Sequence, residues 1–165
     1  MARYKMRQKL LSFGEDFTIT DASGKAAYEV DGKVFSIRER FELKDLEGNV
    51  VTTIRGKLVS IRAKMDILRG DDVAATITKA LFAPFRDKFK VELADDSELR
   101  VDGSILDHEY TIRRGDDVVA QISKRWFTFA DTYGIDVADG EDDALMLSIA
   151  VALDEMAHDP DEGRG

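Results

Sequence analysis

Four basic residues at the start of the chain have a spacing that could bind anions. They occupy alternate positions between residues 3 and 9, and alternate residues of a β-strand point to the same face. A strand here would present four cations together, an arrangement that attracts phosphate-bearing ligands. The alternative is that these cations are solvated outward positions balanced by nearby carboxylates. The candidate ligand-binding residues are these four and two later ones: Arg3, Lys5, Arg7, Lys9, Lys57 and Arg62.

Three acidic segments could suggest a cation site. RGDD occurs at residues 69–72 and again at 114–117, and EDD occupies 141–143. Calcium, however, needs about six to eight oxygen ligands, which a longer loop supplies. Both RGDD segments lie between alternating apolar and polar segments, which favours hairpin turns. The EDD segment precedes an apolar run and favours a helix cap. We therefore predict no metal site.

His108 is a candidate general base because it lies between Asp107 and Glu109. In a strand both neighbours would face away from it, so a structural or surface histidine is favoured. The sequence contains no glycine-rich phosphate loop, HExxH, GxSxG or EF-hand motif. It also has no cysteine, which excludes a thiol nucleophile and thiolate metal ligands. We predict no catalytic residues, no cofactor and no enzymatic activity.

The composition fits one globular domain. The chain has 165 residues, 44% of them hydrophobic, and a formal net charge of −9. This charge weakens the case for nucleic-acid binding, which needs a basic surface. No apolar segment follows the first charged residues as it would in a signal peptide. We expect a cytoplasmic protein without a transmembrane segment, with one domain over residues 1–158 and a flexible polar tail over 159–165.

An internal repeat of about 24 residues determines the expected architecture. Each unit contains a turn signal flanked by short alternating or β-branched segments, which is typical of strand–turn–strand units. Six such units predict about twelve antiparallel strands, and closing them into a barrel removes the exposed edges. The repeat also places a bulky apolar anchor in each unit, and we expect the anchors to pack in the core. For Trp126 the alternative is stacking against a ligand. The anchors are Leu10, Val34, Leu58, Leu81, Ile105 and Trp126.

The apolar run over residues 144–153 predicts a buried helix. Only Ser148 in this run is not hydrophobic, and the run is about half the roughly 20 residues that a bilayer span requires. A helix from about 142 to 157 would need apolar partners on several sides. A twelve-stranded barrel has a lumen too wide for its own side chains to fill. We therefore predict that this helix occupies the lumen.

Three segments resemble the LURP-one-related (LOR) family: RQKLLSFGEDFTITD near the N-terminus, the KLVS-like repeats, and DTYGIDVADGEDDALMLSIAVALD. The resemblance covers Tyr4 to about His158. It implies kinship with the tubby C-terminal domain and with phospholipid scramblases, and a twelve-stranded barrel around a hydrophobic C-terminal helix. Plant relatives are tied to defence, and tubby proteins bind phosphoinositides through basic surface residues. No set of catalytic residues comes with the resemblance.

Together these observations predict a non-enzymatic binding or scaffold module. The expected ligand is an anionic phospholipid headgroup or another phosphorylated molecule, held on the outer surface by the basic residues. One alternative is a protein-interaction scaffold without a small ligand. Another is lipid scrambling or a membrane-tethered regulator, which would require the helix to leave the barrel and is disfavoured by its length and acidic cap. The sequence names neither the partner nor the oligomeric state.

Overall fold

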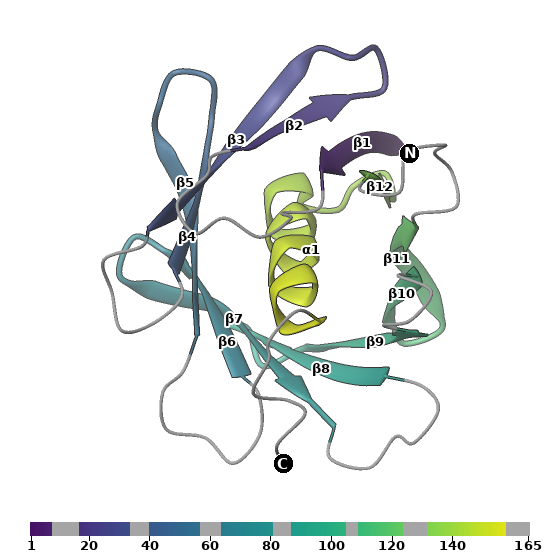
Figure 1. Cartoon of the computed structure of the whole chain (residues 1–165). Coiled ribbons are helices and arrows are strands. Elements are labelled where there is room, and N and C mark those ends of the chain that lie inside the picture. The colour runs from purple at the N-terminus through teal and green to yellow at the C-terminus, as the bar shows by residue number, and fades with distance from the viewer. Residues whose placement is uncertain are drawn as a thin grey trace.

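The computed structural model is a closed antiparallel barrel of twelve strands around one helix (Figure 1). It describes residues 1–7, 17–33, 40–56, 64–80, 87–104, 109–123 and 132–157. The helix α1 covers Asp143–Ala157. The strands are β1 (Ala2–Arg7), β2 (Phe17–Asp21), β3 (Ala26–Lys33), β4 (Arg40–Lys44), β5 (Val50–Gly56), β6 (Lys64–Arg69), β7 (Asp72–Lys79), β8 (Asp87–Leu93), β9 (Glu98–Ser104), β10 (Glu109–Arg114), β11 (Asp117–Ser123) and β12 (Thr132–Val137).

The strands follow one another around the barrel in chain order, and β1 closes it by pairing with β12. The predicted mainly-β barrel is therefore confirmed. Five of the six turns join two strands as expected. The sixth, around Gly140, instead joins β12 to α1, and β1 completes the count of twelve. The reason is local, because the residues after Gly140 form a capped apolar run rather than an alternating one.

The turns themselves have the predicted chemistry. Both RGDD segments form hairpin turns, and their glycines, Gly70 and Gly115, adopt left-handed φ angles of 60° and 61°. Glycine has no Cβ and takes this conformation without strain. The repeated glycine in RGDD is thus explained by turn geometry.

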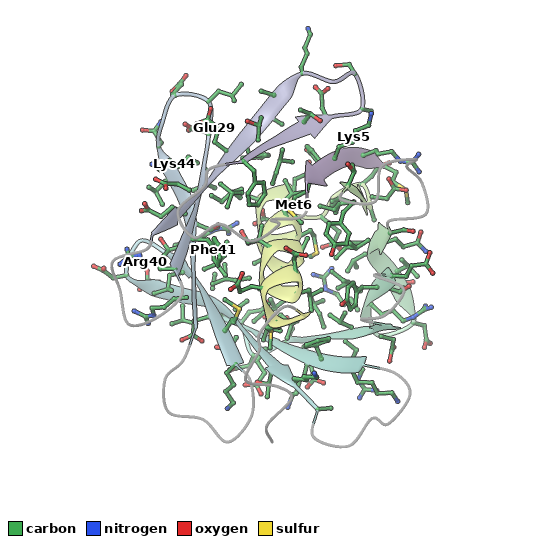
Figure 2. The ribbon with its side chains drawn as sticks, viewed as in Figure 1. Lys5, Met6, Glu29, Arg40, Phe41 and Lys44 are labelled. Carbon is green, nitrogen blue, oxygen red and sulfur yellow. The ribbon has the colours of Figure 1, made fainter. Side chains whose placement is uncertain are left out.

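The helix lies along the lumen and forms the core of the barrel (Figure 1). Leu147, Ile149 and Leu153 have no exposed surface. They pack with inward side chains of the strands, such as Met6 and Phe41, which Figure 2 shows pointing towards the helix. The predicted helix position, about 142–157, is confirmed to within one residue.

Several sequence predictions concern residues outside the described parts of the chain. They include the tail 159–165 and the six anchors Leu10, Val34, Leu58, Leu81, Ile105 and Trp126. His108 and three candidate ligand-binding residues, Lys9, Lys57 and Arg62, also lie outside them.

Candidate functional site

Two tyrosines of the barrel bind the helix through their hydroxyl groups. The hydroxyl of Tyr133 donates a hydrogen bond to Asp154 Oδ1 at 2.7 Å, and that of Tyr4 donates to Asp143 Oδ2. Burial, together with the neighbouring carboxylate, raises the pKa of both tyrosines well above its usual value. Both phenols therefore stay protonated and act as donors to the helix.

A third polar contact joins the middle of the helix to the barrel wall. Ser148 Oγ and Thr52 Oγ1, both fully buried, lie 2.6 Å apart. Ser148 Oγ also donates to the carbonyl of Ala144 at 2.7 Å. The one polar residue of the apolar run is thus hydrogen-bonded, as a buried hydroxyl must be.

The acidic segment before the helix is bound by the barrel. Asp142 Oδ1 accepts the backbone N–H of Leu145 at 3.1 Å, which is the predicted helix cap. Arg69 pairs with Asp142, and Arg114 pairs with Glu141. These arginines are the first residues of the two RGDD segments, so both copies of the segment bind the acidic residues directly before the helix.

Within the described ranges, no three His, Cys, Asp or Glu side chains are grouped so that they could hold a metal ion. Asp71, Asp72, Asp116 and Asp117 instead lie exposed at the two hairpin turns.

The basic stripe on β1 is described only in part. Arg3 and Lys5 have the expected outward direction, since the alternate residues Tyr4 and Met6 pack against the core. Arg3 is engaged: its Nε and Nη2 donate to the two carboxylate oxygens of Asp136 on β12 at 2.6 and 2.8 Å. This bidentate contact raises the pKa of Arg3. A ligand at β1 would therefore compete with Asp136. The side chain of Arg7 lies outside the described set.

Cations gather more densely on another part of the outer wall. A hollow of about 500 Å³ lies over β6, β7, β8 and β9. We name it the β6–β9 hollow. Three carboxylates, Glu92, Glu98 and Asp102, also line it. The five basic residues in its lining are Lys64, Lys79, Lys88, Lys90 and Arg100.

Strand register aligns several of these cations in one row across the sheet. Lys64 is opposite Thr78, Thr78 is opposite Lys90, and Lys90 is opposite Arg100. Arg113 on β10 continues the row. Like charges directly opposite each other on adjacent strands are destabilising.

Carboxylates partly balance two of the five cations, Lys90 and Arg100. Lys90 Nζ lies 3.2 Å from Glu92 and 3.5 Å from Glu98, and Arg100 Nε lies 3.6 Å from Glu98. The bond to Glu92 and the charge of Glu98 raise the pKa of Lys90. No ion pair joins Lys64 or Lys88 to another residue of the described ranges. With five cations and three carboxylates, the hollow has a net charge of 5 − 3 = +2 in a chain of −9.

Sequence reasoning singled out the β1 stripe and did not predict that cations of β6, β7, β8 and β9 line one hollow. Lys88 and Lys90 alternate in the same way as Arg3 and Lys5, and that alternation was the available signal. What the sequence lacked was the register that places Lys64 and Arg100 on the same surface.

The fold and the outer wall define a class of protein: a closed twelve-stranded barrel with a buried C-terminal helix and a charged exterior. The model of the LURP-one-related family matches residues 2–154. The chain belongs to this family, as its sequence segments suggested.

Two further similarities agree with the assignment. An X-ray structure of an Arabidopsis thaliana protein has a similar fold, with a TM-score of 0.67 and 22% sequence identity, over 93% of this chain and 91% of that one. The Bacillus subtilis (strain 168) protein named "Uncharacterized protein YxjI" is 27% identical over 62 residues. That match spans 38% of this chain and 38% of the relative. At this identity the Arabidopsis structure supports the fold alone.

Proposed function

We propose that this protein is a non-enzymatic module that binds an anionic, phosphate-bearing ligand on the outside of its barrel. The observation that carries the proposal is that the helix forms the core of the barrel, while five cations line one hollow of the outer wall. Anionic phospholipid headgroups and other phosphorylated molecules are the ligand class. The predicted kinship with tubby and scramblase domains, and a cytoplasmic location, belong to the same proposal.

Electrostatics supports a local site better than a general one. The chain as a whole repels anions, because its formal charge is −9. A cluster of cations on such a surface attracts an anion only at short range, since the Debye length is about 10 Å at 0.1 M salt. Binding should therefore be saturable and sensitive to ionic strength.

We propose a binding module rather than an enzyme because several polar side chains that could take part in chemistry are bonded to structural partners. Tyr133 bonds to Asp154, and the arginines of both RGDD segments bind the helix entry. An active site needs unlike groups converging on one substrate position, whereas these groups have structural partners. A panel of hydrolase and phosphatase substrates, with and without divalent metals, tests the point. Turnover that the His108→Ala variant lacks would make the protein an enzyme.

The lipid arm of the proposal is tested by co-sedimentation with vesicles. Phosphatidylcholine vesicles with phosphatidylglycerol should retain the protein at low salt and release it as ionic strength rises. Vesicles of phosphatidylcholine alone are the control. An equal, low retention by both vesicle types at every salt concentration would remove the membrane as a ligand source.

A protein-interaction scaffold is the second candidate function, and one observation favours it. Leu46, Val50 and Val73 are exposed at two neighbouring hairpins, β4–β5 and β6–β7, with exposed fractions of 60%, 47% and 43%. Exposed apolar groups at a barrel end can contact a partner protein. This function takes precedence if neither soluble phosphates nor acidic vesicles bind.

A further inference from the structure

The β6–β9 hollow combines two kinds of group that together define a ligand. Its cations can bind a phosphate through charge-assisted hydrogen bonds. Its carboxylates, with the hydroxyl of Thr78, can accept hydrogen bonds from ligand hydroxyl groups. A bare cationic patch would accept any anion. Mixed groups of this kind favour a phosphate ester that also bears hydroxyls.

The positions of the charges indicate which cations a ligand would use. Glu92 and Glu98 lie beside Lys90 and Arg100 and partly neutralise them. Lys64 and Lys88 are on the flanking strands β6 and β8, without an ion pair to any other described residue. Asp102 is opposite Lys88 on β9 but forms no ion pair with it. A phosphate between the two lysines would therefore displace no ion pair with another described residue.

Repulsion within the row of cations also favours an anionic ligand. Lys90 and Arg100 are directly opposite, and Arg113 is opposite Arg100. Like charges in this arrangement repel one another, and Glu92 and Glu98 reduce that repulsion. A bound phosphate anion would reduce it further and so stabilise the folded protein.

We propose that the β6–β9 hollow binds the phosphate of a small polyhydroxyl phosphate ester, with Lys64 and Lys88 as its principal phosphate contacts. This inference rests on the proposed function and gives it a location other than the β1 stripe. The same chemistry occurs free, as in glycerol phosphate, and on a membrane, as in the headgroup of phosphatidylglycerol.

The test uses the full chain and the double variant Lys64→Gln/Lys88→Gln. The matched control is Lys25→Gln/Arg40→Gln, which removes two exposed cations outside the hollow and changes the net charge equally. Figure 2 shows Arg40 on β4, on the outside of the barrel. Glycerol phosphate is titrated against each protein and followed by the backbone amide shifts in an NMR spectrum, with glycerol as the neutral control. The vesicle assay described above is run on the same proteins.

We expect glycerol phosphate to shift amides of Thr78, Lys90 and Arg100. The hollow variant should raise the apparent Kd at least about tenfold, equivalent to about 1.4 kcal/mol, and the control less than about twofold. The hollow variant should also melt close to the parent, because neither lysine has an ion pair with another described residue. Loss of phosphatidylglycerol binding in the hollow variant would make the lipid headgroup one source of the ligand. Binding of glycerol phosphate without vesicle binding would make the source soluble.

Two results would overturn the inference, and they are distinguishable. If amide shifts fall on β1 and β12, and the hollow variant binds like the parent, the hollow is wrong while the proposed function stands with the β1 stripe. If neither glycerol phosphate nor acidic vesicles bind at low salt, both the hollow and the proposed function fail.

Discussion

The inside and the outside of this barrel follow different rules. Inside, apolar side chains of the strands pack against a helix whose run from residue 144 to 153 is buried. The alternation along a strand decides which side chains point inward, and an inward side chain can pack against almost any apolar neighbour. Outside, the effect of a charge depends on which residue lies opposite on the next strand. Arg3 faces Asp136, whereas Lys90 faces Arg100. The contacts of the interior therefore follow from the hydrophobic pattern of the sequence, whereas the contacts of the exterior depend on the register between neighbouring strands.

The largest effect should come from a charge placed inside. Ile149 has no exposed surface, so Ile149→Asp would leave a carboxylate without a partner in the core. We expect a loss of more than about 4 kcal/mol and no stable fold. Ile149→Val is the control and should cost only about 1 kcal/mol. Thermal unfolding followed by circular dichroism measures both. A charged variant that melts within a few degrees of the parent would show that the helix is not the core.

A smaller interior effect is expected at Gly103. A Cβ at this position would lie 2.1 Å from the carbonyl oxygen of Glu109 and 2.7 Å from Cδ1 of Tyr110. Gly103→Ala must therefore displace β10, and overpacking of this kind costs about 1–3 kcal/mol. Chemical denaturation measures the change. Gly48→Ala is the contrast, because a Cβ there meets nothing within 4 Å and its cost comes from the left-handed backbone alone. If Gly103→Ala were neutral, the packing of β9 against Tyr110 would be looser than described.

These interior positions show what the sequence could predict. The period of the repeat and the apolar run were sufficient for closure and the buried helix, because both depend on side-chain pattern alone. The count of twelve strands was reached with β1 in place of a strand after Gly140. The sixth turn was assigned to a hairpin since its residues, ADGE, are turn formers in either context. Only the residues after it decide between a strand and a helix.

The candidate site was less predictable for a physical reason. The alternation of Arg3 and Lys5 indicated an outward basic stripe, but the sequence could not show that Asp136, more than a hundred residues away, binds Arg3. The same limit concealed the hollow, because Lys64, Lys90 and Arg100 belong to three strands aligned by register. The arginines of RGDD were predictable in part. The sequence shows that the segment is repeated, but it does not show that both arginines pair with carboxylates at the start of the helix.

A pH-dependent effect should report on the contact between barrel and helix. Burial and Asp154 raise the pKa of Tyr133 above its usual value near 10. The associated stability is present below about pH 10 and is lost above it, where the unfolded chain ionises. Tyr133→Phe should cost about 1–2 kcal/mol at neutral pH, through the hydrogen bond to Asp154, and should lose less stability between about pH 9 and pH 11. Denaturant unfolding at several pH values gives the comparison. Equal alkaline losses in parent and variant would place the sensitivity elsewhere.

The smallest effects should separate the two cationic regions of the outer wall. Arg3 donates two hydrogen bonds to Asp136, whose side chain is only 7% exposed, although half of the Arg3 side chain is in solvent. Arg3→Gln should therefore cost about 1 kcal/mol, at the upper end for exposed ion pairs. Lys88 has no ion pair with another described residue, so Lys88→Gln should change stability by less than about 0.5 kcal/mol. The free energy of unfolding at low and high salt measures both. High salt should reduce the difference, since screening weakens exposed pairs. A Lys88→Gln variant that costs as much as Arg3→Gln would mean that Lys88 serves the fold, and the β6–β9 hollow would lose the feature that distinguishes it from the β1 stripe.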